Sequence, residues 1–150
     1  MNALRTNDTT KGSAMQLRPY LFFNGRCEEA LHFYRDTLGA EITALMRYKE
    51  SPMPPPNMQP GMEDRIMHAE FRIGESFAMA SDGCDDVPPF AGFSLSIEAR
   101  DADDAEQLFN AMVKGGKVEM PMSETFFSPR FGMLTDRFGV GWMVGYFPPA

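Results

Sequence analysis

HFYRDTLGAE, at residues 32–41, predicts the end of a helix and the start of a strand, and DRFGVGWM, at residues 136–143, predicts a turn near the other end of the chain. The helix that the first segment ends has apolar residues on one face, namely Cys27, Ala30, Leu31, Tyr34 and Leu38. Gly39 can adopt the left-handed conformation that ends a helix, so a strand should follow. In the second segment, Asp136 and Gly139 favour a tight turn before the last apolar strand.

Working outward from these segments, the same order of elements occurs twice. In the first half, strands are predicted at 17–23, 40–48, 65–73 and 76–80, with the helix after the first strand. In the second half, strands are predicted at 92–99, 117–120, 132–135 and 141–147, with a helix that Asp101 caps and Gly115 stops. Such a unit is too small to bury its own sheet, so two units should pair around a shared cavity or interface. We therefore expect one α+β domain over 15–150, built from two βαβββ modules at about 15–86 and 90–148.

Two segments fit neither module. Residues 1–14 are polar and lack periodicity, which is typical of a flexible arm. Residues 51–61 are rich in proline, so they cannot form a regular helix or strand. Loops of this length are either functional covers or mobile insertions, and Met53 and Met58 would suit a flexible lid over an apolar site. Both interpretations of 51–61 stay open.

Composition limits the classes of partner. The 150 residues carry a formal net charge of −7 and have an isoelectric point near 4.8, whereas nucleic acids and anionic membranes bind basic patches, so neither partner is expected. No apolar run approaches the ~20 residues that cross a bilayer, and the first residues lack an apolar signal core. Cys27 and Cys84 are too few for a disulfide framework and are predicted to be free thiols. We expect a cytoplasmic protein.

The motifs resemble those of the vicinal oxygen chelate superfamily, also called the glyoxalase, bleomycin-resistance and dioxygenase superfamily, and within it the PhnB-like branch. The resemblance covers about residues 15–148. The matching residues are 19–25, Glu29–Ala30, Phe33–Tyr34, Leu38–Ala40, 68–71, Ser81–Asp82, 124–127, Phe131–Gly132, 136–139 and Trp142. It implies a glyoxalase-like fold in which each half supplies a curled, mixed four-stranded sheet facing a cavity. It also implies a homodimer, because single two-module chains of this superfamily commonly complete their cavities across a two-fold interface.

The enzymes of this superfamily place up to four metal ligands on the first and last strands of the two halves. Alignment by the quoted segments puts four residues near those positions: Pro19, Ala78, Phe93 and Met143. None is an imidazole or a carboxylate, and only methionine offers even a soft donor, so neither a metal nor another cofactor is expected. The family's usual turn also differs here, with Arg137 in place of a proline and Val140 in place of a histidine.

His68 and Glu124 are the candidate catalytic residues. On strict alternation His68 shares a strand face with Glu70, and a histidine beside a carboxylate can move a proton or bind a polar ligand group. By the resemblance, this strand faces the cavity and the segment of Glu124 crosses the cavity mouth. The alternatives stay open: a solvated polar face for His68 and Glu70, and an ordinary surface carboxylate for Glu124.

Four further residues are candidate ligand contacts. Phe127 and Trp142 would serve as apolar walls, although Trp142 also suits an ordinary core position. Arg47 ends a strand near the proline-rich loop and is either a ligand contact or a solubilising edge residue. Met53 lies in the loop that would cover the site.

Two functions follow as hypotheses. The first is a metal-independent protein of the bleomycin-resistance type that binds a small molecule, and the acidic balance would suit a cationic ligand. The second is an enzyme, metal-independent or of atypical metal dependence, that uses His68 and Glu124 as acid and base. PhnB-like proteins have been labelled demethylubiquinone methyltransferases, but no glycine-rich cofactor loop follows the first predicted strand.

Overall fold

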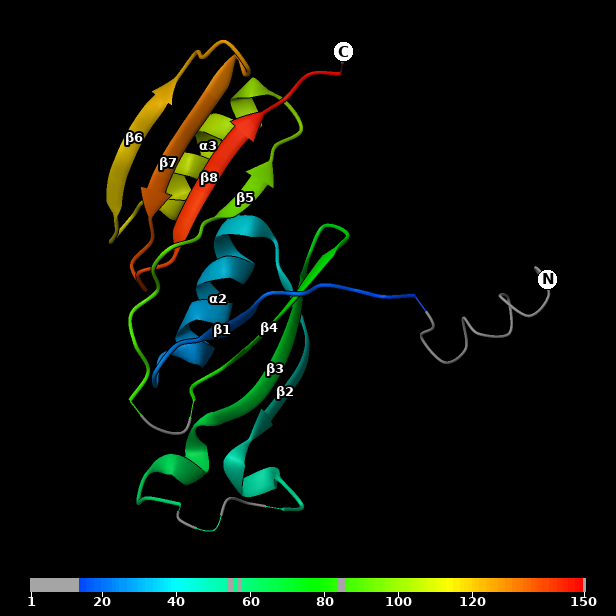
Figure 1. Ribbon diagram of the computed structural model, residues 1–150, viewed down its shortest axis with the longest axis vertical. Coiled ribbons are helices and arrows are strands. Elements are labelled where there is room, and N and C mark those ends of the chain that lie inside the picture. The colour runs from blue at the N-terminus through cyan, green and yellow to red at the C-terminus, as the bar shows by residue number, and fades with distance from the viewer. Residues whose placement is uncertain (1–13, 54–55, 57, 84–85, 150) are drawn as a thin grey trace, which may run out of the picture.

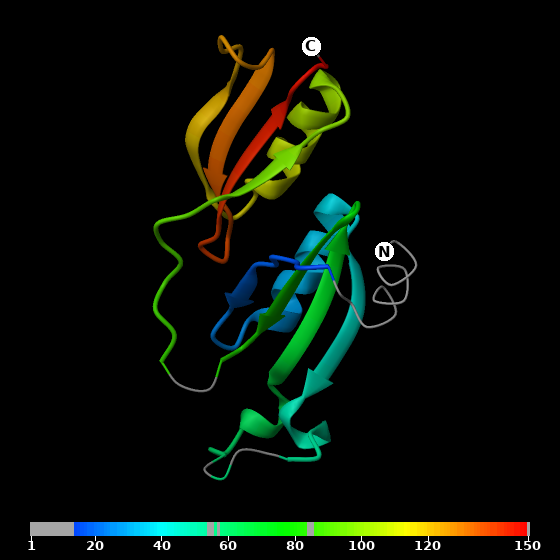
Figure 2. The same ribbon diagram turned by 45° about the vertical axis from the view of Figure 1, so that its right-hand side comes forward.

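The computed structural model describes residues 14–149 except 54–55, 57 and 84–85. The two modules lie one above the other along the long axis (Figures 1 and 2). Module 1 contains β1 (Tyr20–Phe22), α2 (Cys27–Leu38), β2 (Glu41–Arg47), the 3₁₀ turns η1 (Tyr48–Glu50) and η2 (Met62–Asp64), β3 (Ile66–Ile73) and β4 (Ser76–Ser81). Module 2 contains β5 (Leu95–Glu98), α3 (Ala102–Met112), β6 (Lys117–Ser123), β7 (Arg130–Thr135) and β8 (Gly141–Tyr146). Of the predicted arm only Ala14 is described, and Cys84 lies outside the described residues.

Each module forms one mixed four-stranded sheet, which confirms the predicted α+β fold class and the internal repeat. Sheet 1 has the order β1-β4-β3-β2, and sheet 2 has the order β5-β8-β7-β6. In each sheet the first and last strands of the module pair in parallel and the other neighbours are antiparallel. The two sheets stay separate within one chain and leave one face of each uncovered by a helix.

Several strands differ in length from their predicted ranges. β1 and β5 are shorter than 17–23 and 92–99, because only Tyr20–Phe22 and Leu95–Glu98 lie in register with β4 and β8. β6 continues beyond 117–120 to Ser123 and includes Pro121, which has no backbone N–H to donate. An edge strand tolerates this, because its outer side has no neighbouring strand to receive a hydrogen bond.

The two helices form as the sequence pattern predicts. α2 buries Cys27, Ala30, Leu31 and Tyr34. It ends at Gly39, whose φ of 70° is left-handed. The buried carboxylate of Asp82 accepts hydrogen bonds from the Cys27 amide at 2.8 Å and the Ile66 amide at 2.7 Å, which fixes the start of the helix against β3. In α3 the Asp101 side chain caps the helix by accepting from the Asp104 amide.

The predicted hairpin at 136–143 joins the modules. The buried carboxylate of Asp136 accepts hydrogen bonds from the Tyr34 hydroxyl of module 1 at 2.6 Å and from the Trp142 indole N–H at 2.9 Å. The same carboxylate accepts the amides of Phe138 and Val140, which holds the turn closed. Burial, together with the charge of Asp136, raises the pKa of Tyr34 well above its ordinary value. The two segments that define the repeat therefore also contact each other.

Two further expectations have an outcome in the described residues. Cys27 is a free thiol, fully buried under α2, and burial raises its pKa. Within the described part of the chain, no helix combines the length and the apolar character needed to span a bilayer.

Candidate functional site

The uncovered face of sheet 1, here called the open face of module 1, carries the candidate site. On β3 and β4 the helix-facing residues Ala69, Phe71, Ala78 and Ala80 belong to the core. The residues that alternate with them on the same strands, and their register neighbours on β1 and β2, face the other way: Tyr20, Met46, His68, Glu70, Phe77 and Met79. This face is largely apolar with a polar centre, and it also carries the ion pair of Arg72 with Glu41, beside Phe77.

Three side chains at that centre form a hydrogen-bonded chain. The Tyr20 hydroxyl lies 3.0 Å from Nδ1 of His68, and Nε2 of the same ring lies 3.2 Å from Oε2 of Glu70. A carboxylate accepts hydrogen bonds, so with a neutral ring the proton resides on Nε2 and leaves Nδ1 as an acceptor. The Tyr20 O–H therefore donates to His68, and the free lone pairs of its oxygen can accept a hydrogen bond from a ligand.

The chain of Tyr20, His68 and Glu70 is accessible and has an apolar rim. The side chains of His68 and Glu70 are 34% and 37% exposed. The ring of Phe22 lies 5.0 Å from that of Tyr20, and Phe22, Met46 and Phe77 are each partly exposed. A small molecule with an aromatic or apolar body and a hydrogen-bond donor would match this combination.

Alternation correctly placed His68 and Glu70 on one face, but it did not identify Tyr20. Tyr20 reaches His68 because β1 pairs in parallel with β4, with Tyr20 opposite Met79, and β4 pairs with β3. The two residues are 48 positions apart in the sequence. Only the strand order could have indicated this contact, since local periodicity carries no information about it.

Glu124 lies in the connection between β6 and β7, at the far end of module 2 from sheet 1 (Figure 1). It is exposed, and within one chain the structure does not bring it to His68. The following turn is rigid, because the Thr125 hydroxyl accepts from the amides of Phe127 and Ser128. Phe126 is 100% exposed, and Phe127 packs its ring 5.0 Å from that of Phe131.

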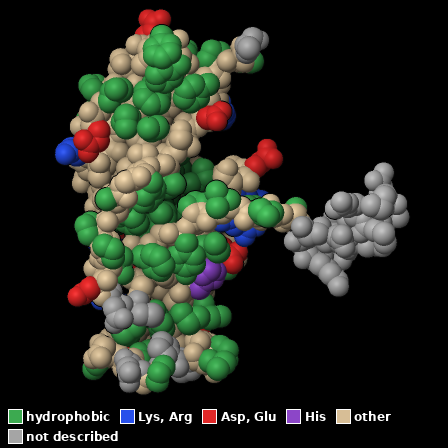
Figure 3. All heavy atoms as spheres, viewed as in Figure 1, with side chains coloured by type: hydrophobic (Ala, Val, Ile, Leu, Met, Phe, Trp, Pro, Cys, Tyr) green, Lys and Arg blue, Asp and Glu red, His purple; other side chains and the backbone are tan. Residues whose placement is uncertain are grey.

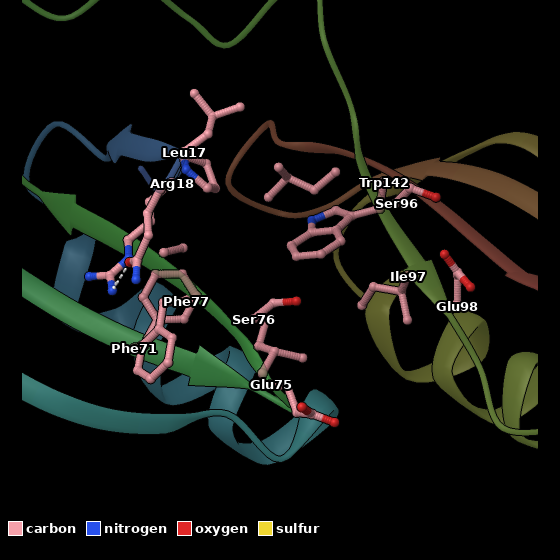
Figure 4. A pocket seen from close by; sticks show the side chains of 16 residues that line it. Leu17, Arg18, Phe71, Glu75, Ser76, Phe77, Ser96, Ile97, Glu98 and Trp142 are labelled. Atoms are coloured by element: carbon pink, nitrogen blue, oxygen red, sulfur yellow. Dashed lines mark hydrogen bonds between the residues drawn. The ribbon is translucent and has the colours of Figure 1, made fainter. Parts of the chain in front are cut away.

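Trp142 occupies a core position rather than the open face. It is 2% exposed, and its indole packs 5.4 Å from the Tyr34 ring. One edge of it lines a groove of about 900 Å³ between the modules (Figure 4). The opposite wall of this groove includes Arg18 and Phe77, and Glu98 lies on the same side as Trp142. Tyr20, His68 and Glu70 do not line this groove.

Arg47 has a local role in module 1. Its guanidinium forms an ion pair with Glu28 at 2.8 Å and donates to the Asp64 carbonyl, so it ties β2 to α2 and to η2. The hydrogen bond from Arg47 lowers the pKa of Glu28. Met53 is mostly exposed, and residues 54–55 and 57 of its loop lie outside the described residues. Neither Arg47 nor Met53 contacts the chain of Tyr20, His68 and Glu70.

The positions aligned with metal ligands do not fit a hard divalent ion. Ala78 faces α2 in the core, whereas its neighbour Met79 is on the open face. The alignment with the metal-ligand position on β4 therefore differs by one residue from the residue on the open face. Met143 does lie on the uncovered face of sheet 2, but Pro19, Met79 and Phe93 bring no imidazole or carboxylate beside it. Among the described residues no cluster of three or more His, Cys, Asp or Glu side chains has metal-binding geometry.

Comparison with known proteins identifies close relatives of the whole domain. The profile of a family described as 3-demethylubiquinone-9 3-methyltransferase matches residues 15–145. Protein YjdN of Escherichia coli K12 is 36% identical over 138 residues, which are 87% of this chain and 94% of YjdN. The crystal structure of protein PA1353 from Pseudomonas aeruginosa is 40% identical with a TM-score of 0.80, covering 89% of this chain and 98% of that one. The PhnB protein of Bacillus cereus is 27% identical with a TM-score of 0.75, covering 88% and 99%.

The residues after β1 do not fit the cofactor that a methyltransferase name implies. A nucleotide-type cofactor is commonly cradled by a glycine-rich turn between a strand and a helix. Here the turn has one glycine, Gly25, and a Cβ at that position would lie 3.4 Å from the Arg65 guanidinium. The turn therefore packs against a side chain of the protein itself.

Proposed function

We propose that this chain, which belongs to the PhnB-like, 3-demethylubiquinone-9 3-methyltransferase family of the vicinal oxygen chelate superfamily, is a small-molecule binding protein. The ligand binds on the open face of module 1 without a metal ion. One observation carries the proposal: Tyr20, His68 and Glu70 form a hydrogen-bonded chain on an accessible sheet face among apolar side chains. A solvated polar surface would have no such rim of Phe22, Met46 and Phe77.

The ligand class follows from the orientation of the chain. The Tyr20 oxygen accepts a hydrogen bond, and Glu70 adds a negative charge on the same face, so the ligand carries an N–H or O–H donor and is neutral or cationic. Its body is aromatic or apolar, because Phe22, Met46 and Phe77 surround the polar centre. The net charge of −7, like the charge of Glu70, favours cationic over anionic ligands.

A second copy of the chain completes the binding cavity in this proposal. Within one chain the open face is only a wall, and apolar side chains of both modules stay partly exposed, including Phe22, Met46, Phe93 and Met120. A homodimer that covers these faces would remove them from water and enclose the ligand. A compact monomer in gel filtration with light scattering, at micromolar concentration, would contradict this part. The protein acts in the cytoplasm in this proposal.

A second candidate function is acid–base catalysis, which the same geometry favours. A ligand proton passes to the Tyr20 oxygen while the Tyr20 proton moves to Nδ1 of His68. The products are a deprotonated ligand and an imidazolium that Glu70 stabilises. Glu124 would take part only from a second copy of the chain, since in its own chain it lies at the far end of module 2.

The test is a binding screen with matched variants. Aromatic amines, phenols, aromatic carboxylates and S-adenosylmethionine are screened by thermal shift, and hits are measured by calorimetry. Tyr20→Phe and Glu70→Gln should each weaken binding of an aromatic amine at least tenfold. Glu98→Gln, in the groove between the modules, should leave it unchanged.

Three outcomes would overturn the proposal. The first is a flat screen on folded protein, and the second is binding that Glu98→Gln abolishes while Tyr20→Phe does not. The third is stoichiometric zinc, nickel, manganese or iron in protein purified without chelator. Substrate turnover that His68→Ala abolishes would select the enzyme over the binding protein.

A further inference from the structure

We propose that Met120, Met133 and Met143, on the open face of module 2, form a binding site for a soft monovalent metal ion, copper(I). The site lies on the other sheet and shares no side chain with the chain of Tyr20, His68 and Glu70, although Met120 also belongs to the surface that the proposed homodimer covers. It depends on the alignment of three thioether side chains across three neighbouring strands.

The strand register places the three methionines in one row. Met143 of β8 is opposite Met133 of β7, and Met133 is opposite Met120 of β6. Residues directly opposite each other in antiparallel strands have Cβ atoms about 5 Å apart and point to the same face. The row therefore has Met133 at its centre, and the register of β6 shifts on either side of Met120.

The burial of neighbouring residues fixes which face the row occupies. Trp142 and Val144 flank Met143 and belong to the core, so Met143 points away from α3. Leu134 is also in the core, so its neighbour Met133, like Met143, points away from α3. Met120 is partly exposed and does not pack against the core. Figure 3 shows hydrophobic side chains gathered on this face over β6–β8.

Met122, on the same strand as Met120, shows what a packing methionine looks like here. A Cβ at Gly132 would lie 2.6 Å from the Met122 sulfur and 2.8 Å from the Phe109 ring, so Met122 fills the gap between β7 and α3. It packs against the core, whereas the three methionines of the row are on the uncovered side. The row is thus not required to fill the interior of module 2.

The donor chemistry selects the metal. Thioether sulfur is a soft, neutral ligand that prefers copper(I) and is a poor ligand for zinc, magnesium or manganese. Three neutral donors leave the ion with its single positive charge, which the net charge of −7 on the chain favours. Methionine has three rotatable bonds, so outer side chains about 5 Å from the centre of the row can lean toward one ion.

Module 1 supplies a matched control. Its equivalent row contains Ala44, Glu70 and Met79, which gives a single thioether. This row of module 1 therefore cannot supply three sulfur ligands. Met79→Leu tests the equivalent position on module 1, and Met122→Leu tests the helix side of module 2.

The experiment uses Ag⁺, a redox-inert ion that shares the preference of copper(I) for sulfur. Titrations are performed on the full chain with both cysteines replaced, Cys27→Ala and Cys84→Ser, because thiolates also bind Ag⁺. Methionine ε-methyl signals in ¹³C-labelled protein report which sulfurs bind. We expect one Ag⁺ per chain, shifts of the Met120, Met133 and Met143 methyl signals together, and at least tenfold weaker binding in Met133→Leu.

The controls decide between a site and general sulfur affinity. Met79→Leu and Met122→Leu should bind Ag⁺ as the parent does. Absence of retained Ag⁺, equal binding by Met133→Leu, or shifts confined to other methionines would each overturn the proposal. Leucine conserves the side-chain volume. If Met133→Leu is nevertheless misfolded by circular dichroism, the Met120→Leu, Met143→Leu double variant provides the same test with the central residue intact.

Discussion

The open faces of the two modules differ although their helix-covered faces are built alike. If Met79 and Met143 are taken as equivalent positions on the last strands, strand register makes Glu70 correspond to Met133, and His68, two positions earlier on β3, correspond to Phe131 on β7. His68 is accessible, whereas Phe131 is 6% exposed beneath Phe127 and Phe147. The repeated unit thus keeps one side for folding and leaves the other free to diverge, toward a polar chain in module 1 and toward sulfur and aromatic side chains in module 2.

Removal of Asp136 should cause the largest loss of stability, because it affects the side that both modules share. Asp136→Ala leaves Tyr34 and Trp142 as buried donors without an acceptor, so we expect a cost of about 4 kcal/mol. Asp82→Ala, within module 1, removes the acceptor of two amides and should cost about 2–3 kcal/mol. Urea unfolding at pH 7 measures both variants. An equal or smaller cost for Asp136→Ala would contradict the larger contribution assigned to the joint between the modules.

Exchange of equivalent residues tests the divergence of the open faces directly. Phe131→His places an imidazole under two aromatic rings and should cost about 3 kcal/mol of folding free energy. His68→Phe, at an accessible position, should change stability by less than about 1 kcal/mol. The same variant should abolish binding of the aromatic amine. Comparable stability losses in the two variants would mean that the faces are not divided between packing and binding.

High pH should weaken the joint through Tyr34. Burial raises its pKa in the folded state, so the neutral hydroxyl contributes stability below about pH 10, the pKa of an unfolded tyrosine. This contribution declines as pH rises from there toward the folded pKa. Tyr34→Phe should lower the free energy of unfolding by about 1–2 kcal/mol at pH 7. Between pH 9 and pH 11 the free energy of unfolding of this variant should fall by less than that of the parent.

Urea midpoints across this pH range measure the effect. Cys27, whose pKa burial also raises, titrates in the same direction. Both proteins contain it, so it cancels from their difference. Parallel pH profiles for Tyr34→Phe and the parent would contradict the role of Tyr34.

The sequence predicted those parts of the fold and site that depend on local pattern. Helical spacing identified the buried face of α2, and strand alternation put His68 beside Glu70. Tyr20 required the parallel pairing of β1 with β4, which no local pattern specifies. The same lack of long-range information explains why Glu124 was grouped with His68 although they belong to different modules.

Errors of a single residue had a large effect in the strands. Ala78 was aligned with a metal-ligand position on the last strand of module 1, but in the structure it points to α2 and its neighbour Met79 faces the open side. Successive strand residues point to opposite faces. An alignment shift of one residue therefore replaces a residue on the open face by one in the core. Arg47 illustrates a different limit, since its partner Glu28 is on a helix and only the folded structure brings them together.

The ion pair of Glu28 with Arg47 should give the smallest effect, since it lies at the edge of module 1 and away from both open faces. The hydrogen bond from Arg47 lowers the folded pKa of Glu28, so its contribution to stability is present above about pH 4.5 and is lost as pH falls through the folded value. Both side chains are partly exposed, and water screens the pair. Glu28→Gln should therefore lower the melting temperature by only about 2 °C at pH 7, and the difference from the parent should shrink as the pH falls below about 4.5. Arg47→Gln should match it and leave ligand binding unchanged, whereas a tenfold loss of binding in Arg47→Gln would extend the ligand site from the open face to the edge of β2.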